Sequence, residues 1–270
     1  MLTVIIGKSG SGKDTLRNIL TEKWGYEPIL SVTTREPREG EKDGVDYHFV
    51  SNEEFERMLS TGEIFEYRAY ESSKGNVCFG SRKYDLDPDK NYVRVVDPAG
   101  AEKYLEIYGR SNCFVVNVSV PDGLRYVRAL KREGIDPATC EEDKMEHFQQ
   151  EWFKRLEDDA KKFSPEKMEN LVNFNLNNTL ESKEIMEEEF IEAVNAYTHR
   201  LNTDKRKGVD NNIHYVIVQN SDKENYSNYY AAVDKDNARF FKPANDKVSS
   251  SGIEEMASLE FSRHITEEER

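Results

Sequence analysis

The sequence predicts an α/β fold in which a parallel sheet is flanked by helices on both faces. Short, unbroken apolar runs recur within segments 2–6, 92–100, 112–122 and 171–176. Such runs are typical of strands that are buried on both sides. Helical patterns lie between them, and an alternation of strands with helices favours a parallel sheet.

The helical segments can be placed from the spacing of their apolar residues. Residues 13–25 place Leu16, Ile19 and Leu20 on one face, and Gly25 stands where that helix should end. Ser51, followed three residues later by Glu54, is typical of a capping box at a helix start. Two longer charged or amphipathic segments, 122–165 and 182–201, are also expected to be helical.

Beyond residue 202 the character of the chain changes. Apolar runs at 213–219, 229–234 and 238–243 alternate with Asn, Asp and Ser, which predicts a small antiparallel meander. We therefore expect a principal domain over 1–202 and a small β-rich C-terminal extension over 203–270. An oligomer contact, a partner-binding surface and a cover for the principal domain all remain possible roles for the extension.

Composition limits the functional class. The chain has 270 residues and a formal net charge of −14, which argues against a general nucleic-acid binder but not against a nucleotide enzyme. No segment approaches the roughly 20 apolar residues that span a bilayer, so no membrane association is expected. Three scattered cysteines, Cys78, Cys113 and Cys140, suit a reducing compartment, and we expect a cytoplasmic protein.

The strongest motif is a glycine loop over residues 7–13, directly after the first apolar run. Gly7, Gly12 and Lys13 fit the phosphate-loop pattern G-x-x-x-x-G-K. In such loops main-chain N–H groups and a helix N-terminus converge on phosphate oxygens. The alternative is a Gly/Ser-rich turn without a ligand. The predicted nucleotide contacts here are Gly7, Ser9, Gly10, Ser11, Gly12, Lys13, Asp14 and Thr15.

Asp14 stands where the pattern has Ser or Thr, and Thr15 follows one position late. The usual hydroxyl ligates Mg²⁺, and a carboxylate is also a hard oxygen ligand. We therefore expect Asp14 and Thr15 to hold the metal in a different way from the usual hydroxyl. We do not expect them to abolish nucleotide binding.

A second dense segment, 31–50, brings Ser31, Arg35, Arg38 and Tyr47 close together in sequence. Two arginines can clamp one phosphate through charge-assisted hydrogen bonds, with the two hydroxyls completing the site. A polar surface loop with solvated arginines is an equally good interpretation of these residues alone.

The segment from Ser31 to Val50 meets the pattern S-x-x-T-R-x-P-R-x-G-E-x-x-G-x-D-Y-x-F-V, and with it the chain resembles the guanylate kinase family over roughly residues 2–200. The resemblance implies a phosphate-loop core, a small monophosphate-binding lobe (31–91) and a mobile lid (122–165). It also implies transfer of the γ-phosphoryl group of ATP to GMP or dGMP, with Mg²⁺.

The resemblance assigns roles by position in the small lobe. Ser31, Arg35, Arg38 and Tyr47 resemble the ligands of the GMP phosphate. Glu66 resembles the reader of guanine, because a carboxylate accepts from N1–H and the exocyclic amine. The segment Cys78–Ser81 is similar to Y-Y-G-[ST], and the remaining substrate positions are Phe79, Gly80, Ser81 and Asp97.

Each of these residues also has a structural interpretation, and three positions depart from the family pattern. Glu66 could be a solvated glutamate, and Asp97 could cap the next helix. Phe79 replaces a tyrosine, Val95 replaces a second acid, and Asp14 replaces a hydroxyl. Extra residues around 72–76 are expected to lengthen a hairpin.

The predicted lid supplies positive charge for phosphoryl transfer. Arg128 and Arg132 resemble the lid arginines of the family, with Arg155 as a third, although arginines on a charged helix are usually solvated. Asn177 would lie near adenine, although an Asn at a strand end often forms a turn.

The predicted activity is therefore ATP- and Mg²⁺-dependent phosphorylation of GMP or dGMP. The catalytic residues would be Lys13, Arg35, Arg128, Arg132 and Arg155. Two alternatives stay open: a related kinase acting on ribose bisphosphate or another nucleoside monophosphate, and a non-catalytic binding module.

Overall fold

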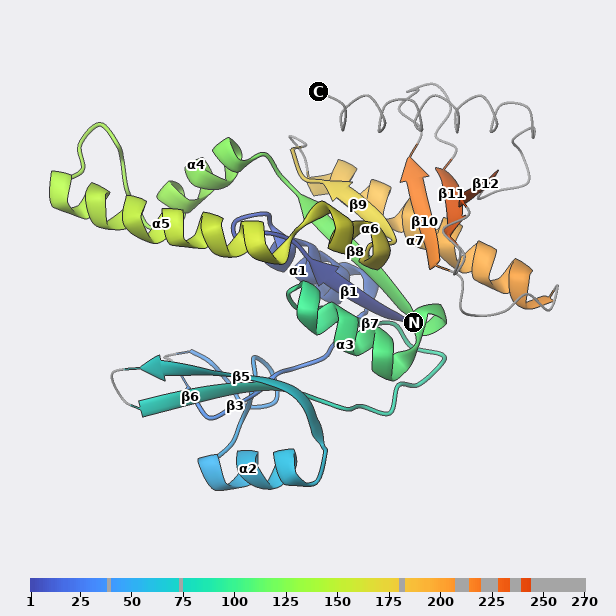
Figure 1. Cartoon of the computed structure of the whole chain (residues 1–270), viewed down its shortest axis with the longest axis horizontal. Coiled ribbons are helices and arrows are strands. Elements are labelled where there is room, and N and C mark those ends of the chain that lie inside the picture. The colour runs from blue at the N-terminus through green and yellow to red at the C-terminus, as the bar shows by residue number, and fades with distance from the viewer. Residues whose placement is uncertain are drawn as a thin grey trace.

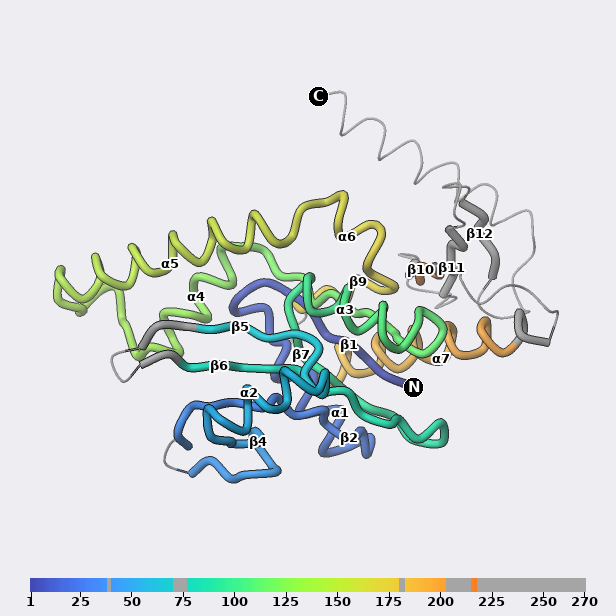
Figure 2. Tube along the Cα trace, turned by 60° about the horizontal axis from the view of Figure 1, so that its bottom comes forward, coloured from blue at the N-terminus to red at the C-terminus, as the bar shows by residue number. Residues whose placement is uncertain are grey.

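The computed structural model of the chain describes residues 1–37, 40–72, 75–179, 183–206, 214–219, 228–233 and 239–243. A large sheet forms the centre of this part of the chain (Figure 1). A helical arm and a small lobe project from the same side of it, as both Figure 1 and the turned view in Figure 2 show. The predicted α/β class is confirmed.

The large sheet has the strand order β12-β11-β10-β9-β8-β1-β7-β2. Strand β1 lies between β7 and β8, and β9 follows β8, all parallel to one another. The four apolar runs that predict buried strands thus lie side by side in the parallel part of this sheet. The bounds of the strands in this half are β1 Leu2–Ile6, β2 Glu27–Pro28, β7 Tyr92–Val95, β8 Cys113–Ser119 and β9 Phe174–Asn177.

Helices cover both faces of this sheet. Because successive side chains of a strand point to opposite faces, Leu2, Val4 and Ile6 pack into one apolar cluster and Ile5 into another. The first cluster includes residues of α3 and α6, and the second includes residues of α1 and α7. These helices are α1 Lys13–Trp24, α3 Pro98–Tyr108, α6 Pro165–Leu171 and α7 Lys183–Arg206, and a short 3-10 turn, η1 Arg110–Asn112, follows α3.

Two predicted helix ends can be compared with the structure. Helix α1 ends at Gly25, whose φ of 66° lets its N–H donate to the Leu20 carbonyl, as expected. Helix α2 (Asn52–Ser60) starts at Ser51, whose Oγ accepts from the Glu54 N–H at 3.2 Å. The Glu54 carboxylate pairs with Arg57 rather than returning to Ser51, so only half of the predicted capping box is seen.

The small lobe (residues 31–91) has its own sheet, in the order β4-β3-β6-β5, and a small core under α2. Its strands are β3 Val32–Thr33, β4 His48–Phe49, β5 Ile64–Ser72 and β6 Gly75–Arg82. Strands β5 and β6 form a long antiparallel hairpin. The predicted insertion at its tip falls partly on residues 73–74, which lie outside the described residues.

The helical arm (residues 122–165) consists of α4 (Asp122–Arg132) and α5 (Glu142–Lys162). Its apolar side chains form a cluster of their own, in which Leu130, Phe148 and Trp152 are buried. The arm is therefore packed internally rather than through the central core.

The three C-terminal strands form the predicted antiparallel meander, and they extend the large sheet. Strand β10 pairs with β9 where Ile217 faces Phe174. The buried Asn173 side chain links the two parts: its Oδ1 accepts from the Val115 N–H at 2.7 Å, and its Nδ2 donates to the Tyr215 carbonyl at 2.6 Å. The strands are β10 His214–Gln219, β11 Asn228–Val233 and β12 Arg239–Pro243. None of the described helices is both long and apolar enough to cross a bilayer.

Candidate active site

The glycine loop joins β1 to α1 and offers a set of main-chain donors. Gly10 and Gly12 have φ values of 77° and 96°, a conformation that favours glycine. The N–H groups of Gly10, Gly12, Lys13 and Asp14 make no hydrogen bond within the described residues. Four such donors at a helix N-terminus form a concave site suited to a phosphate.

Two glycines of the loop also allow a close approach by neighbouring atoms. A Cβ at Gly7 would lie 2.6 Å from the Val118 carbonyl oxygen, and one at Gly12 would collide with Nδ2 of Asn178. Asn178 in turn donates to the Ser11 carbonyl at 2.7 Å. The loop is thus packed against the ends of β8 and β9, so its shape is fixed from outside as well as by its glycines.

The apex of the loop is held by two side chains from the helical arm. The Ser9 N–H donates to Asp159 Oδ2 at 3.1 Å, and the Ser9 carbonyl accepts from Arg125 Nε at 2.7 Å. Arg125 is fully buried and forms ion pairs with Asp159 and Asp122. Sequence reasoning missed Arg125 and Asp159, because neither belongs to a motif, and they lie far in the chain from each other and from Ser9.

Lys13 lies at the loop, where its Nζ donates to the Lys8 carbonyl at 3.0 Å. Burial lowers the pKa of its ammonium group, and the negative charges of Asp14 and Asp159 counter that shift. Asp14 is exposed in the first turn of α1, and Thr15 is partly buried beside it. A carboxylate and a hydroxyl therefore stand together where the glycine loop ends.

The structure brings one of the three predicted lid arginines to the loop. Arg128 donates to the Asn178 carbonyl at 2.8 Å and to the Ser11 carbonyl at 3.4 Å. Arg132 is exposed and pairs with Glu133 at 3.3 Å. Arg155 is partly exposed and makes no hydrogen bond or ion pair within the described ranges.

Asn177 and Asn178 have different surroundings. Asn178 is the residue that contacts the glycine loop, whereas Asn177 lines a neighbouring cavity of about 560 Å³ with Lys8 and Pro121. This cavity lies at the ends of β8 and β9, and its remaining lining residues are Ser119, Val120, Asp122, Asn175 and Thr179. The sequence predicted Asn177 and gave no indication of the Asn178 contact.

In the small lobe, Arg35 and Tyr47 lie together as predicted. The Arg35 guanidinium stacks 5.3 Å from the Tyr47 ring centroid and pairs with Glu41 at 2.8 Å. Phe79 meets the Tyr47 ring edge-on, with 5.9 Å between centroids. Ser31 precedes β3 and accepts from the His48 N–H through its carbonyl. Arg38 lies outside the described residues.

Further along the lobe, Glu66 and Ser81 are in direct contact. The buried Ser81 hydroxyl donates to Glu66 Oε2 at 3.0 Å and accepts from Arg94 Nη2 at 3.0 Å. Next to Ser81, a Cβ at Gly80 would lie 3.0 Å from side-chain atoms of Phe55 and Ile64, so a larger residue would crowd the lobe core. The predicted guanine end of the site is thus assembled from β5 and β6.

Asp97 performs two functions at the end of β7. Its Oδ1 accepts from the Gly100 N–H at 3.0 Å, so it caps α3, and it also pairs with Arg68. Burial alone would raise the pKa of Asp97, but the hydrogen bonds from Arg68 and Gly100 and nearby positive charges outweigh it, and the pKa lies below 3.8. Val95, two residues earlier, adds no carboxylate.

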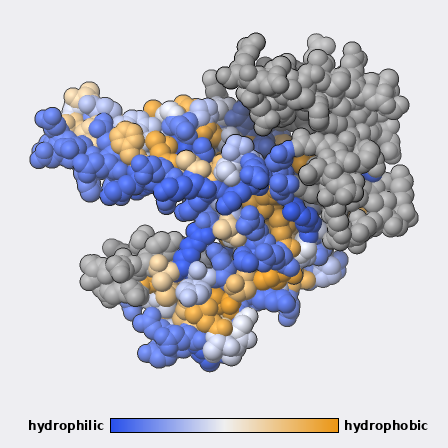
Figure 3. Space-filling model, viewed as in Figure 1, coloured by the Kyte–Doolittle hydropathy of each residue, from blue (hydrophilic) through white to orange (hydrophobic). Residues whose placement is uncertain are grey.

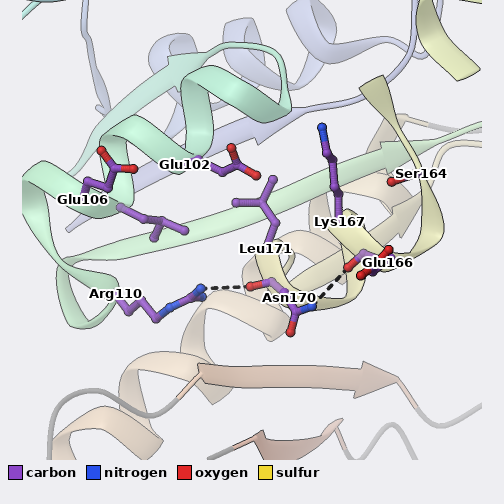
Figure 4. A pocket seen from close by; sticks show the side chains of 9 residues that line it. Glu102, Glu106, Arg110, Ser164, Glu166, Lys167, Asn170 and Leu171 are labelled. Atoms are coloured by element: carbon purple, nitrogen blue, oxygen red, sulfur yellow. Dashed lines mark hydrogen bonds between the residues drawn. The ribbon is translucent and has the colours of Figure 1, made fainter. Parts of the chain in front are cut away.

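The helical arm, whose base contacts the glycine loop, and the small lobe flank a cleft. Figure 3 shows a deep notch between the helical arm and the small lobe. A second cavity, of about 580 Å³, lies elsewhere, between α3 and α6 (Figure 4). It is lined by residues of both charges, among them Glu102, Arg110 and Lys167, and by none of the predicted site residues. The cleft is therefore the candidate active site.

Comparison with known proteins relates the sequence of the chain to one family. A family model for guanylate kinase matches residues 1–83. Guanylate kinase from Enterococcus faecalis is 36% identical over 126 residues, which cover 46% of this chain and 56% of that protein. Guanylate kinase from Chlamydia pneumoniae is 32% identical over 152 residues, covering 54% of this chain and 71% of that protein.

A solved structure, the crystal structure of guanylate kinase from Anaplasma phagocytophilum, is similar at 23% identity with a TM-score of 0.41, covering 76% of this chain and 85% of the other. The chain spans little more than half of the Enterococcus relative, and the family match ends at residue 83, before the helical arm. The 32% identity over more than two thirds of the Chlamydia protein is the finding that decides the family. The chain belongs to the guanylate kinase family.

Proposed function

We propose that the protein transfers the γ-phosphoryl group of ATP to GMP or dGMP. The observation that carries the proposal is the pairing of two separate sites across one cleft. One is the set of N–H groups of Gly10, Gly12, Lys13 and Asp14, which have no partner among the described residues, and the other is the Glu66–Ser81 contact in the small lobe. An anion site opposite a base-reading carboxylate suits a donor triphosphate and an acceptor nucleotide.

On the donor side, the glycine loop binds the phosphates through its main chain. Lys13 supplies a positive charge that becomes more effective because the group is partly removed from water. Asn177 and Lys8 line the cavity beside the loop, which is where we place the nucleoside of ATP. We place residues 1–202 in the kinase and leave 203–270 without a catalytic role.

On the acceptor side, Arg35 and Tyr47 bind the phosphate of the monophosphate, together with Ser31 and Arg38. Arg35 is held by Glu41, a pair that the more highly charged phosphate would have to displace or share. Glu66 accepts from the guanine N1–H and amine. Asp97 is linked to Glu66 by Arg68, which pairs with both carboxylates. Phe79 offers only a ring edge where a hydroxyl would add a further donor.

The transfer itself needs alignment and charge neutralisation rather than a covalent intermediate. Arg128 already lies at the glycine loop, whereas Arg132 and Arg155 are displayed on the arm without a fixed partner from the loop. Closure of the arm would add their charges to the equatorial oxygens of the transferred group and exclude water.

Asp14 and Thr15 fit a magnesium ion held mainly by phosphate oxygens. No cluster of three acidic, histidine or cysteine side chains that could bind a metal occurs among the described residues. Mg²⁺ does not need one, because in phosphate sites it usually keeps waters and takes one or two carboxylates plus the substrate. When bound, the ion would neutralise charge on the ATP phosphates.

The test is ADP release measured with ATP and Mg²⁺ against GMP, dGMP, AMP, UMP and ribose bisphosphate. Turnover with GMP or dGMP at least a hundredfold above the other acceptors is the expected result. Turnover confined to ribose bisphosphate would replace the proposal with the sugar-phosphate alternative. Nucleotide binding without turnover of any acceptor would replace it with a binding module.

A further inference from the structure

Arg68 is an additional charged residue at the base-reading end of the small lobe. It follows Glu66 by two positions on β5, so both side chains lie on the same face of the strand. Its Nη2 lies 3.4 Å from Glu66 Oε1, and the same nitrogen pairs with the Asp97 carboxylate. The guanidinium therefore bridges the two carboxylates that are predicted at the base site.

The position of Glu66 is fixed from its other end. Ser81 donates to Glu66 Oε2, Arg94 donates to Ser81, and Arg94 itself donates to the Ile29 carbonyl at 2.9 Å. Arg94 and Ser81 are both buried. This chain of hydrogen bonds leaves Glu66 with one oxygen at Ser81 and the other beside Arg68. Across the site there is thus first a donor, the Arg68 guanidinium, and then two acceptors, Oε1 and Oε2 of Glu66.

That order complements one edge of guanine. The guanine edge presents O6 as an acceptor, N1–H as a donor and the exocyclic amine as a donor. Adenine presents a donor at position 6 and an acceptor at N1. It would therefore place a donor against Arg68 and an acceptor against Glu66. A guanidinium and a carboxylate are also the side-chain groups that pair best with guanine acceptors and with donors on a base, respectively.

We propose that Arg68 is a specificity-determining residue that donates to O6 of guanine beside Glu66. The inference rests on the proposed function for the choice of a purine acceptor. The ion pair with Asp97 holds Arg68 at the site, so that the guanidinium does not pair with Glu66 alone. Glu66 selects the N1–H and the amine, and Arg68 selects the oxygen at position 6.

Two substrate analogues separate these contacts. In 6-thio-GMP the oxygen at position 6 becomes sulfur, a weak acceptor, while N1–H and the amine stay. In IMP the amine is absent while O6 and N1–H stay. Arg68→Met removes the guanidinium and keeps an unbranched side chain. Arg57→Met is the matched control, because Arg57 belongs to the same lobe but pairs with Glu54 and Glu63.

The experiment is calorimetric titration of GMP, 6-thio-GMP and IMP into the wild type and both variants. For the wild type we expect 6-thio-GMP to bind about tenfold more weakly than GMP, the size of a lost hydrogen bond from a charged donor. In Arg68→Met the dissociation constants of GMP and 6-thio-GMP should differ by no more than twofold. The ratio of the dissociation constants of GMP and IMP should stay as in the wild type. Arg57→Met should reproduce both wild-type ratios.

Two results would overturn the inference. An unchanged 6-thio-GMP ratio in Arg68→Met would show that the guanidinium does not meet O6. An equal fall in both ratios would show that Arg68 acts only by positioning Glu66. Because the readout is binding, it is independent of turnover: a wild type that binds GMP but fails the ADP-release test contradicts the proposed function and still decides the role of Arg68. A wild type that binds none of the three contradicts both.

Discussion

Arg125 and Asp159 form a buried ion pair, and together they hold both main-chain groups of Ser9 at the apex of the glycine loop. Arg125 comes from α4 and Asp159 from the last turns of α5. The Trp152 ring lies 5.5 Å from the Arg125 guanidinium and shields the pair. The base of the helical arm is thus anchored to the loop, so the closure that we propose would move the rest of the arm about this fixed end.

Removing one partner of this pair should be costly. In Asp159→Ala, Arg125 would remain buried without its main counter-charge, and we expect the free energy of unfolding to fall by about 3–5 kcal/mol. Urea denaturation measures the change. Asp158→Ala, on the exposed side of the same helix, should cost less than about 1 kcal/mol, because its pair with Lys162 is solvated. Equal losses in the two variants would contradict the anchoring role.

The lid arginines should separate into two kinds. Arg132→Met should lower kcat by roughly 10²–10³ while leaving the melting temperature unchanged, because Arg132 is exposed in the free protein. Arg128→Met should lower both kcat and the melting temperature, because the carbonyls of Ser11 and Asn178 lose their donor. Steady-state kinetics and thermal melting on both variants make the comparison, with Lys131→Met as an exposed control. A similar melting shift for Arg128→Met and Arg132→Met would count against the observed contacts.

Asp97 gives a prediction about pH. Its pKa in the folded protein is below the ordinary 3.8, so the folded state binds its proton more weakly than the unfolded state. The stabilisation is therefore present above the unfolded pKa and is lost as the pH falls through the folded pKa. Asp97→Asn keeps a capping group for α3 but lacks this ionisation. The difference in unfolding free energy between wild type and variant should be constant from pH 6 to 8 and shrink below about pH 4. Urea denaturation across that range checks it, and a constant difference down to pH 3 would refute it.

The sequence predicts those parts of the fold that are set by local pattern. The run 2–6, the helix from Lys13 and the end at Gly25 follow from unbroken apolar content, helical spacing and a glycine cap, and the structure contains all three. The two-residue strands β2 and β3 are too short for any periodicity to reveal. The joining of β10 to β9 depends on a choice of partner across the chain, which local pattern does not encode.

The same distinction applies to the site. Motifs singled out the glycine loop, Arg35 with Tyr47, and Glu66 with Ser81. Arg68, Arg94, Arg125, Asp159 and Asn178 were missed, because a charged residue outside a motif has no distinguishing pattern until its partner is known. Asn178, one position after the predicted Asn177, makes a contact with the glycine loop that no motif specifies. The roles of all these residues in binding stay predictions.

The most direct test of the central claim is detection of the product by phosphorus NMR after mixing ATP, Mg²⁺ and GMP with the wild type and with Lys13→Ala. The wild type should give GDP and ADP in equal amounts, and Lys13→Ala should form them at least a hundredfold more slowly while its far-UV circular dichroism is unchanged. If the wild type forms no GDP, or Lys13→Ala forms it at the wild-type rate, then the glycine loop does not serve phosphoryl transfer as described.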